Sequence, residues 1–449
     1  MTQTTDTAGL TPEQRAEYLA LLTPENLSAL MRSTWTWDDR ALRRTLSDLI
    51  VDLSAVAELR RGDVVCTDAV IHAAESRVLA ATGEFIAEVL GPRLLIDTGN
   101  PFRAAMLTLT TATAALTADA ERALDVVAQD VTGRVIERTE ELAAILPEDR
   151  WPDKAFTGSA IHLARVAYSA GYTLSPTPYF GAAGLGAQAF WIAGSPTDDT
   201  VDVHTCTLAA AEKTGSWDPA LVKTRATPVG DGWEITGEKW YVPGASDAAT
   251  LLVIARTIGG PSLYAVERSA PGVTVEPLDG LDEAHQLSRI TFEAAPGRLI
   301  GRDGAGGRIM NRTVDKAGTV LAGEQMGLVD RALGDYSQVP PSCDDDAAWR
   351  RYTRLIAGLE VARCTATALW YRAVTLQGDD DLDAASVAAA IAHIGCSRAV
   401  RRVALLLGSA ASGIDGEVVA GLRNRARTTD LLLGGPALAH ERMLERLGI

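Results

Sequence analysis

The residues best suited to ligand chemistry lie in one stretch of the chain, from Cys206 to Ala245. Its first half contains the carboxylate of Glu212, followed by a small, hydroxyl-bearing turn at Gly215 and Ser216. Its second half contains Trp240, an aromatic residue that could form the wall of a cofactor site or simply fill the core. Glu212, Gly215 and Ser216 also fit an ordinary turn. The stretch is therefore a candidate ligand site whose geometry depends on the elements around it.

Those elements are predicted to be β-strands. The segments 221–227 and 233–242 have strand character and flank Gly230-Asp231-Gly232, where glycine supplies the positive φ that a tight hairpin turn needs. From about residue 201 to residue 295 the hydrophobic pattern keeps a period of two. We expect strands at 201–209, 220–228, 233–242, 250–257, 262–267, 272–278 and 288–293. This spacing predicts a small antiparallel sandwich or barrel of about seven strands.

Helical patterns occupy both sides of this β-rich part. Thr11-Pro12 and Thr23-Pro24 carry helix-start signals, and the pattern is helical almost throughout from Trp37 to about Leu146, broken at Gly99-Asn100-Pro101. Helices return at 308–337, 347–376, 384–407 and 416–432, which predicts a four-helix bundle. The acidic runs 344–346 and 379–383 favour the N-termini of two of these helices.

The predicted fold class is therefore α+β, in three domains. We expect an N-terminal all-α domain over 1–200 with a frayed tail at 1–10, a central β-domain over 201–300, and a C-terminal helical bundle over 301–449.

Composition narrows the function classes. A hydrophobic fraction of 47% with only 5% aromatic residues indicates a core of Ala, Leu and Val, as in packed helices. A formal charge of −16 repels polyphosphates at long range and argues against a nucleic-acid partner, so a phosphate-bearing ligand would need a local basic patch. The five cysteines lack metal-binding spacing, and the chain shows neither a signal-peptide pattern nor an apolar run long enough for a membrane. These features predict a cytoplasmic protein with free thiols and no metal site.

Two further patterns have a structural and a functional interpretation. Gly181 to Gly186 is rich in glycine, but no strand leads into it, so a helix packed closely through small residues is favoured over a phosphate loop. Arg423, Arg425 and Arg427 form a basic cluster on an acidic chain. Solvation at the surface is the simpler explanation, and binding of a cofactor phosphate or coenzyme A phosphate is the alternative.

The order helical, β, helical resembles the acyl-CoA dehydrogenase family from about Pro147 to Ile449. Four motifs carry the resemblance in the right order: Cys206–Asp218, Gly237–Trp240, Ala322–Gly327 and Leu422–Arg442. The second motif is similar to the actinobacterial variant of the family, with a GxKxxVPxA pattern at Gly237, Lys239, Val242, Pro243 and Ala245.

The resemblance implies an oxidoreductase in which FAD lies between the β-domain and the bundle. A glutamate of the family removes a proton from the α-carbon of an acyl thioester while hydride passes from the β-carbon to the flavin. In this chain Gly434 occupies the usual position of that glutamate, and Ala317 occupies the position used by some relatives. Asp315 faces about 200° around the helix from Ala317 and is a poor substitute. The resemblance thus predicts a divergent member that lacks the catalytic glutamate.

The flavin contacts implied by the resemblance are also altered. Ala211 and Val242 stand where relatives carry threonine, which removes hydroxyl groups whose hydrogen bonds are worth about 0.5–1.5 kcal/mol each. Backbone N–H groups remain available to a flavin. The implied cofactor-binding residues are Ala211, Glu212, Gly215, Ser216, Trp240, Val242 and Arg425.

Three functions follow as hypotheses from this pattern. The first is a divergent flavoprotein acting on an acyl thioester of coenzyme A or of an acyl-carrier protein. The second is the non-catalytic subunit of a heteromeric acyl-CoA dehydrogenase, paired with an intact homologue. The third keeps the fold for a flavin-dependent monooxygenase or a redox-free enzyme. A homo-oligomer or a hetero-oligomer is expected in each case.

Overall fold

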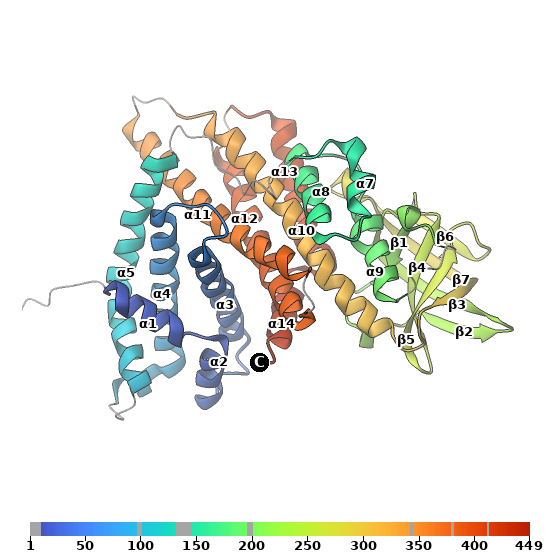
Figure 1. Cartoon of the computed structure of the whole chain (residues 1–449), viewed down its shortest axis with the longest axis horizontal. Coiled ribbons are helices and arrows are strands. Elements are labelled where there is room, and N and C mark those ends of the chain that lie inside the picture. The colour runs from blue at the N-terminus through green and yellow to red at the C-terminus, as the bar shows by residue number, and fades with distance from the viewer. Residues whose placement is uncertain are drawn as a thin grey trace, which may run out of the picture.

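The computed structural model describes residues 10–96, 101–131, 145–194, 201–341, 345–378, 381–410 and 413–449. A large helical part makes up most of the molecule, and a smaller β-sheet part lies at one end of its long axis (Figure 1). The predicted tail before Leu10, the break at Gly99-Asn100 and the acidic residues Asp344, Asp379 and Asp380 lie outside the described residues. Within them, no helix combines the length and the apolar character needed to cross a membrane.

The N-terminal helices begin with the predicted caps. The Thr11 side chain accepts a hydrogen bond from the backbone of Gln14, whose side chain reciprocates, and Thr23 caps the next helix in a similar way through Asn26. The all-helical character predicted for this region is confirmed in its described part. Its elements are α1 (Pro12–Leu21), α2 (Pro24–Ser33), α3 (Arg40–Arg61), α4 (Asp68–Leu90), η1 (Gly91–Leu95) and α5 (Pro101–Val131).

The C-terminal helices match the four predicted ones and include a fifth that the sequence pattern did not separate. Asp345 and Asp415 cap two of them, and Asp381 accepts a hydrogen bond from Ala384 at the start of a third. Gly434 and Gly435 have φ of 98° and 76°, which ends one helix and lets Pro436 start the last. The elements are α10 (Gly306–Ser337), α11 (Asp346–Leu376), α12 (Leu382–Ala410), α13 (Gly416–Leu431), η7 (Leu432–Gly434) and α14 (Gly435–Arg446).

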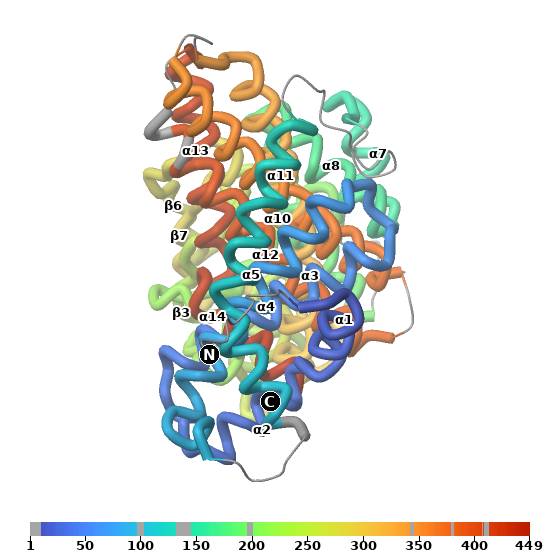
Figure 2. Tube along the Cα trace, turned by 90° about the vertical axis from the view of Figure 1, so that its left-hand side faces the viewer, coloured from blue at the N-terminus to red at the C-terminus, as the bar shows by residue number. Residues whose placement is uncertain are grey.

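The N-terminal helices pack directly on this bundle. From the helical side of the molecule, α3, α4 and α5 run alongside α11 and α12 (Figure 2). Leu46 and Ile50 of α3 share one hydrophobic core with Leu369 of α11 and Cys396 of α12. The first and last parts of the chain are therefore joined by a common core, and the domain boundaries at 200 and 300 stay predictions.

Short helices connect the helical part to the sheet. They are η2 (Glu148–Arg150), α7 (Trp151–Ala155), α8 (Ala160–Thr173), the π-helical η3 (Phe180–Gly186), α9 (Ala187–Ile192) and η4 (Val203–Thr205). A Cβ atom at Gly181 would lie 2.4 Å from the Pro243 carbonyl oxygen, and one at Gly186 would lie 2.6 Å from Cys206 Sγ. The glycine-rich segment is thus a helix in close contact with the sheet, as predicted.

The β-part contains the expected strands and the predicted hairpin, in which Val229 pairs with Gly232. Six of the seven described strands follow the order β1-β4-β2-β3-β7-β5, and β6 pairs with β7 off this path. A further β4–β5 pairing closes the sheet on itself, as in a barrel. The strands are β1 (Cys206–Ala209), β2 (Arg225–Val229), β3 (Gly232–Pro243), β4 (Thr250–Thr257), β5 (Gly260–Glu267), β6 (Val273–Pro277) and β7 (Leu287–Ile300), with η5 (Pro219–Leu221) and η6 (Glu283–His285) between them.

The prediction of a wholly antiparallel sheet is wrong. Strand β1 pairs with β4 in parallel, and β2 also meets β4 in parallel at Arg225 and Arg256. The β2–β3 hairpin lies between β1 and β4 in the chain, so it acts as the crossover that a parallel pair requires. The period-two pattern is the same for both pairings and cannot distinguish them.

Candidate functional site

A cavity of about 390 Å³ lies where the sheet meets the C-terminal helices. We call it the junction cavity. Phe180 of η3 and Tyr241 of β3 contribute aromatic walls, and Leu431 to Gly434 close it from the end of α13. The remaining lining includes the apolar side chains of Leu185, Trp217, Pro243, Leu281 and Leu287, which suit a flat or aliphatic group. It is the natural candidate site because two sequence motifs more than 200 residues apart meet there.

The loop after β1 is held in shape by Glu212. Its Oε1 atom accepts hydrogen bonds from the backbone N–H groups of Lys223 and Thr224, both at 2.8 Å, and from Thr224 Oγ1 at 2.9 Å. Lys239 Nζ lies 3.3 Å away and also donates to the Ala210 carbonyl at 2.9 Å. Burial lowers the pKa of Lys239 to about 8, although Glu212 opposes the shift. Glu212 thus anchors the loop, and its hydrogen-bonding capacity is used within the protein.

A β-bulge decides which aromatic side chain faces the junction cavity. Lys239 pairs with Ile290 and Val242 pairs with Ser288, so Trp240 and Tyr241 together oppose one residue of β7. Tyr241 has a φ of 57°, which is unusual for a bulky residue, and its ring lines the cavity. The extra residue therefore turns Tyr241 toward the cavity.

Trp240 contacts a different set of residues. Its indole Nε1 donates to Glu238 Oε2 at 2.9 Å, and the guanidinium of Arg289 lies 5.0 Å from the ring centroid. Lys213 Nζ approaches the same ring at 5.7 Å. Trp240 is thus in contact with charged side chains of the sheet and is absent from the lining of the junction cavity.

The remaining predicted site residues have different positions. Ala211 and Gly215 line the junction cavity. Ser216 Oγ accepts a hydrogen bond from the Asp218 backbone at 3.1 Å and shapes the turn, and Val242 is buried in the core of the sheet. Arg425 is only 4% exposed, so the prediction of one surface cluster with Arg423 and Arg427 is wrong for this residue. It lies on the inner face of α13, whereas its two neighbours are exposed.

Gly434 and Ala317, the two positions at which the resemblance implies a catalytic glutamate, differ in relation to the cavity. Gly434 lines it, with a φ of 98° that strongly favours glycine. Ala317 is fully buried in the core beneath the sheet and is not part of the lining. Asp315 turns toward α12 and α14, where it accepts from Ser386 Oγ at 2.8 Å and pairs with Arg446 at 3.2 Å.

A buried ionic network, which the sequence did not reveal, backs one wall of the cavity. Arg425 Nη1 donates to Glu324 Oε1 at 2.9 Å, and Arg425 Nε lies 2.7 Å from Asp282 Oδ2. His285 lies between the same carboxylates, with Nδ1 2.6 Å from Asp282 Oδ2 and Nε2 3.3 Å from Glu324 Oε2. The Tyr179 hydroxyl donates to Glu324 Oε2 at 2.8 Å. Asp282 and His285 also line the cavity.

The charges of this network cancel. Burial alone would lower the pKa of His285, but Glu324 and Asp282 raise it to about 9, so the ring is a cation at neutral pH. The pKa of Asp282 and that of Glu324 are lowered by His285 and Arg425, which outweigh burial. Two cations thus balance two carboxylates, and neither carboxylate is a strong base. Within the described residues, no group of three or more His, Cys, Asp or Glu side chains could hold a metal ion.

Comparisons with known proteins agree with this architecture. Residues 207–295 match the family model described as acyl-CoA dehydrogenase, middle domain. A probable acyl-CoA dehydrogenase of Mycobacterium bovis is 32% identical over 131 residues, which is 26% of this chain and 20% of that protein. The chain therefore covers about a fifth of the length of this curated relative.

Solved structures share the fold. The crystal structure of an FAD-dependent dehydrogenase matches with a TM-score of 0.58 and 20% identity, over 72% of this chain and 96% of that one. A prolyl acyl carrier protein oxidase matches with a TM-score of 0.57 and 17% identity, over 73% of this chain and 98% of the other. At these identities the likeness establishes the fold.

Proposed function

The middle domain, the curated relatives and the fold all point to the acyl-CoA dehydrogenase family, and from that premise we propose that the chain is a flavoprotein that binds an acyl thioester. The acyl group, carried by coenzyme A or by an acyl-carrier protein, occupies the junction cavity. The observation that carries the proposal is the meeting of Ala211 and Gly215 with Gly434 around one apolar cavity. These residues belong to the first and last of the four family-like motifs.

The residues present fit the ring of FAD. Tyr241 and Trp217 offer flat aromatic surfaces, and Thr214 supplies a hydroxyl next to the loop backbone. A Cβ atom at Gly215 would meet only the Tyr241 ring, at 3.8 Å, so a ligand can approach this backbone closely. Within the described lining there is no lysine or arginine, so the cavity suits the ring and the acyl group better than the phosphates. Bound FAD would supply the hydride acceptor.

The chain's own groups offer little basicity at this site. Gly434 has no side chain to accept a proton, and Asp282 is the only carboxylate in the described lining. Its Oδ2 atom contacts both His285 and Arg425, which hold its pKa below the ordinary value. The proposal therefore assigns binding to the junction cavity and predicts slow removal of the α-proton, with Asp282 as the candidate acceptor in the described lining.

The absorbance spectrum of the purified protein and a titration with FAD test the proposal. We expect flavin absorbance, or saturable FAD binding, that a Tyr241→Ala variant weakens. An acyl-CoA series is then titrated, with Asp282→Asn separating binding from proton removal in an assay with an artificial electron acceptor. A protein without flavin absorbance and without FAD affinity contradicts the proposal.

A second function, the non-catalytic subunit of a heteromeric dehydrogenase, is favoured by Gly434 itself. Its left-handed backbone sits at the place of the expected base, and a Cβ atom there would approach Leu438 to 2.5 Å. The positive φ disfavours any other residue at this position, and Leu438 would have to move to admit a side chain. Co-expression with an intact homologue checks this alternative, because turnover should then require both chains. Turnover by the chain alone as a homo-oligomer rules it out.

A further inference from the structure

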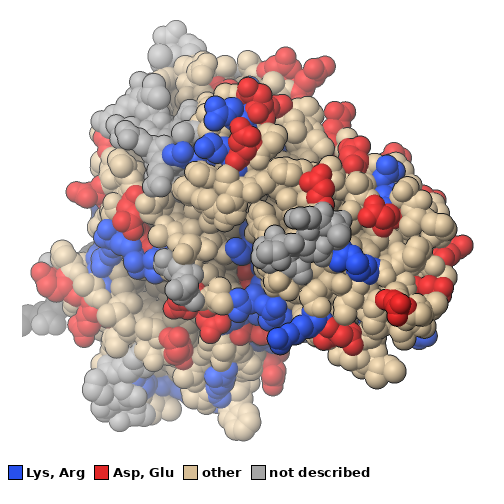
Figure 3. Space-filling view, turned by 45° about the vertical axis from the view of Figure 1, so that its right-hand side comes forward, with Lys and Arg blue, Asp and Glu red and all other residues tan. Residues whose placement is uncertain are grey.

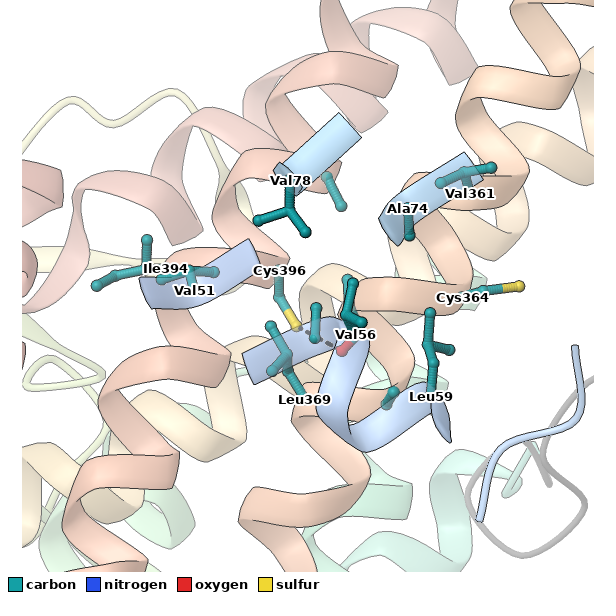
Figure 4. Close-up of a cluster of buried hydrophobic side chains, with 14 of the residues drawn as sticks. Val51, Val56, Leu59, Ala74, Val78, Val361, Cys364, Leu369, Ile394 and Cys396 are labelled. Atoms are coloured by element: carbon teal, nitrogen blue, oxygen red, sulfur yellow. Dashed lines mark hydrogen bonds between the residues drawn. The ribbon is translucent and has the colours of Figure 1, made fainter. Parts of the chain in front are cut away.

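A second and larger cavity, of about 720 Å³, lies within the helical part. It is bounded by α3 and α4 on one side and by α11 and α12 on the other, and we call it the arginine cavity. Figure 4 shows a neighbouring cluster of buried hydrophobic side chains, which includes the lining residues Val51, Ala74, Val78, Val361 and Leu369. Small residues such as Ala81 and Gly395 also line it and leave the space between the helices.

The polar lining of this cavity is strongly basic. It contains Arg77 from α4 and Arg398, Arg401 and Arg402 from α12, against the single carboxylate of Asp52 in the described lining. Arg398 and Arg402 are one helical turn apart and share a face of α12. Such a group is unexpected on a chain of net charge −16. On the surface seen in Figure 3, by contrast, acidic and basic side chains are interspersed.

Two of these arginines are paired and two are not. Arg398 contacts Asp52 at 3.0 Å, and Arg401 lies 3.7 Å from Asp430. Arg77 and Arg402 make no ion pair within 4.0 Å among the described residues. They approach the cavity from opposite sides, and the pKa of Arg77 is lowered first by burial and then by the like charge of Arg402. Glu121 and Asp52 oppose this shift. Four arginines against one carboxylate in the described lining leave an excess of positive charge that an anion would match.

We propose that the arginine cavity binds a phosphorylated small molecule with an apolar body, of the nucleoside diphosphate class. Guanidinium groups bind phosphate oxygens in a bidentate manner, and Arg77 and Arg402 can grip such a group from two helices. The apolar floor would hold the base. The volume lies within the range of roughly 300–1,000 Å³ typical of small-molecule sites. The proposal is independent of the redox function, since none of these residues lines the junction cavity.

The test uses isothermal titration calorimetry on the full chain with ADP, inorganic phosphate and adenosine as probes. We expect ADP to bind more tightly than either fragment, and the affinity to fall with added salt. Arg77→Gln and Arg402→Gln are each expected to weaken ADP binding by about tenfold or more, because each removes charge-assisted hydrogen bonds. The matched control is Arg350→Gln on α11, whose side chain is 80% exposed and outside the cavity.

A steric variant keeps the test independent of charge. Ala81 is exposed to the cavity, so Ala81→Phe should fold normally and block the apolar body of the ligand. Folding of each variant is checked by circular dichroism and by thermal unfolding. We expect Ala81→Phe to weaken ADP binding while leaving inorganic phosphate unaffected.

FAD and coenzyme A each contain an adenosine diphosphate group, so both are also titrated as ligands. If Arg402→Gln weakens the binding of ADP, FAD or coenzyme A and Tyr241→Ala does not, the ligand binds in the arginine cavity. Absence of ADP, FAD and coenzyme A binding at millimolar concentration overturns the proposal. So does binding that is equally tight in Arg77→Gln, Arg402→Gln and the control. If these two variants instead change the oligomeric state and no probe binds, the face is an interface for an acidic partner and the proposal is wrong.

Discussion

The junction cavity is bordered by buried charges that are all paired, whereas the arginine cavity is bordered by partly exposed arginines of which only some are paired. Around the junction cavity, Arg425 and His285 are fully matched by Asp282 and Glu324, and the network contributes no net charge to the space it borders. Around the arginine cavity, Arg77 and Arg402 make no ion pair within 4.0 Å among the described residues, and Asp52 is the one carboxylate in the described lining. The first arrangement fixes loops and helices in place, whereas the second is suited to an external anion.

The paired charges of the junction cavity should contribute to the stability of the fold, whereas the unpaired arginines should contribute to ligand binding. Breaking a matched buried pair leaves an uncompensated charge, which is expensive, whereas removing an unmatched charge relieves repulsion. Mutations of like type should thus have opposite consequences in the two cavities.

Arg425→Met should destabilise the protein most. The substitution leaves Asp282 and Glu324 with His285 as their only cation, and loss of one partner of a buried ion pair typically costs about 3–5 kcal/mol. Urea unfolding at pH 7 measures the change. Arg423→Met, two residues earlier and exposed, is the control and should change the free energy of unfolding by less than about 0.5 kcal/mol. Equal effects of the two variants would mean that the network does not stabilise the fold.

His285→Gln should remove a pH dependence. The folded pKa of His285 is about 9, above the unfolded value of about 6.5. Its contribution to stability is therefore complete below pH 6.5 and is lost as the pH rises to 9, an effect on the order of 3 kcal/mol. We expect the wild-type free energy of unfolding to fall more steeply over this window than that of the variant. Parallel curves for the two proteins would contradict the assignment of the protonated ring.

His393 and His440 change the free energy of unfolding in a different pH range from His285. The comparison of wild type with His285→Gln is therefore specific to His285. Burial lowers the pKa of each to about 4, so each contributes stability that is present above the unfolded pKa and is lost as the pH falls toward 4. Neither changes its contribution between pH 6.5 and 9. The difference between wild type and His285→Gln in that range thus reports on the network alone.

Tyr241→Ala and Trp240→Ala form a matched pair at the bulge. Tyr241 lines the junction cavity, so its truncation should weaken the binding of FAD or of an acyl thioester by about tenfold, equivalent to about 1.4 kcal/mol. Trp240 contacts Glu238 and Arg289 outside the cavity, and its truncation should leave that affinity unchanged. Titration of both variants with FAD measures the effect. A larger loss for Trp240→Ala would place the ligand on the other side of β3.

This pair also shows where sequence reasoning reached its limit. The strand from 233 to 242 was predicted correctly because its pattern and the glycine turn are local properties. The bulge between Lys239 and Val242 does not change the hydrophobic pattern of the strand. Its extra residue nevertheless turns a different side chain toward the junction cavity. Trp240 was therefore selected from the sequence, whereas Tyr241 lines the cavity.

The buried network was hidden for a different reason. Asp282, Glu324 and Arg425 lie far apart in the chain, and only the packing of η6, α10 and α13 brings them together. One signal was available, since Glu324 is the only charged residue in the segment 317–328 of a long helix, and a charge among such residues needs a partner. The helix itself, its neighbours and the Asp345 cap were predictable from periodicity and end signals. Partners across the fold were not.

The smallest predicted change in stability is the difference between substitutions of two arginines on the same face of α12. Arg398 is paired with Asp52, so Arg398→Gln should destabilise the protein by up to about 1 kcal/mol. Arg402 has no such partner among the described residues, so Arg402→Gln should be neutral or stabilising by a few tenths of a kcal/mol, and less so in high salt. Thermal unfolding at low and high ionic strength measures both.

Saturating ADP should reverse this order. Ligand binding stabilises the folded state by an amount that grows with the logarithm of the ratio of free ligand to Kd. Arg402→Gln reduces that gain because it removes a phosphate contact and raises the Kd. The variant that is the more stable of the two without ligand should then unfold first with ligand. If Arg402→Gln remains more stable than Arg398→Gln in the presence of ADP, Arg402 does not contact the ligand. The difference between the two cavities would then concern only how their charges affect the stability of the fold.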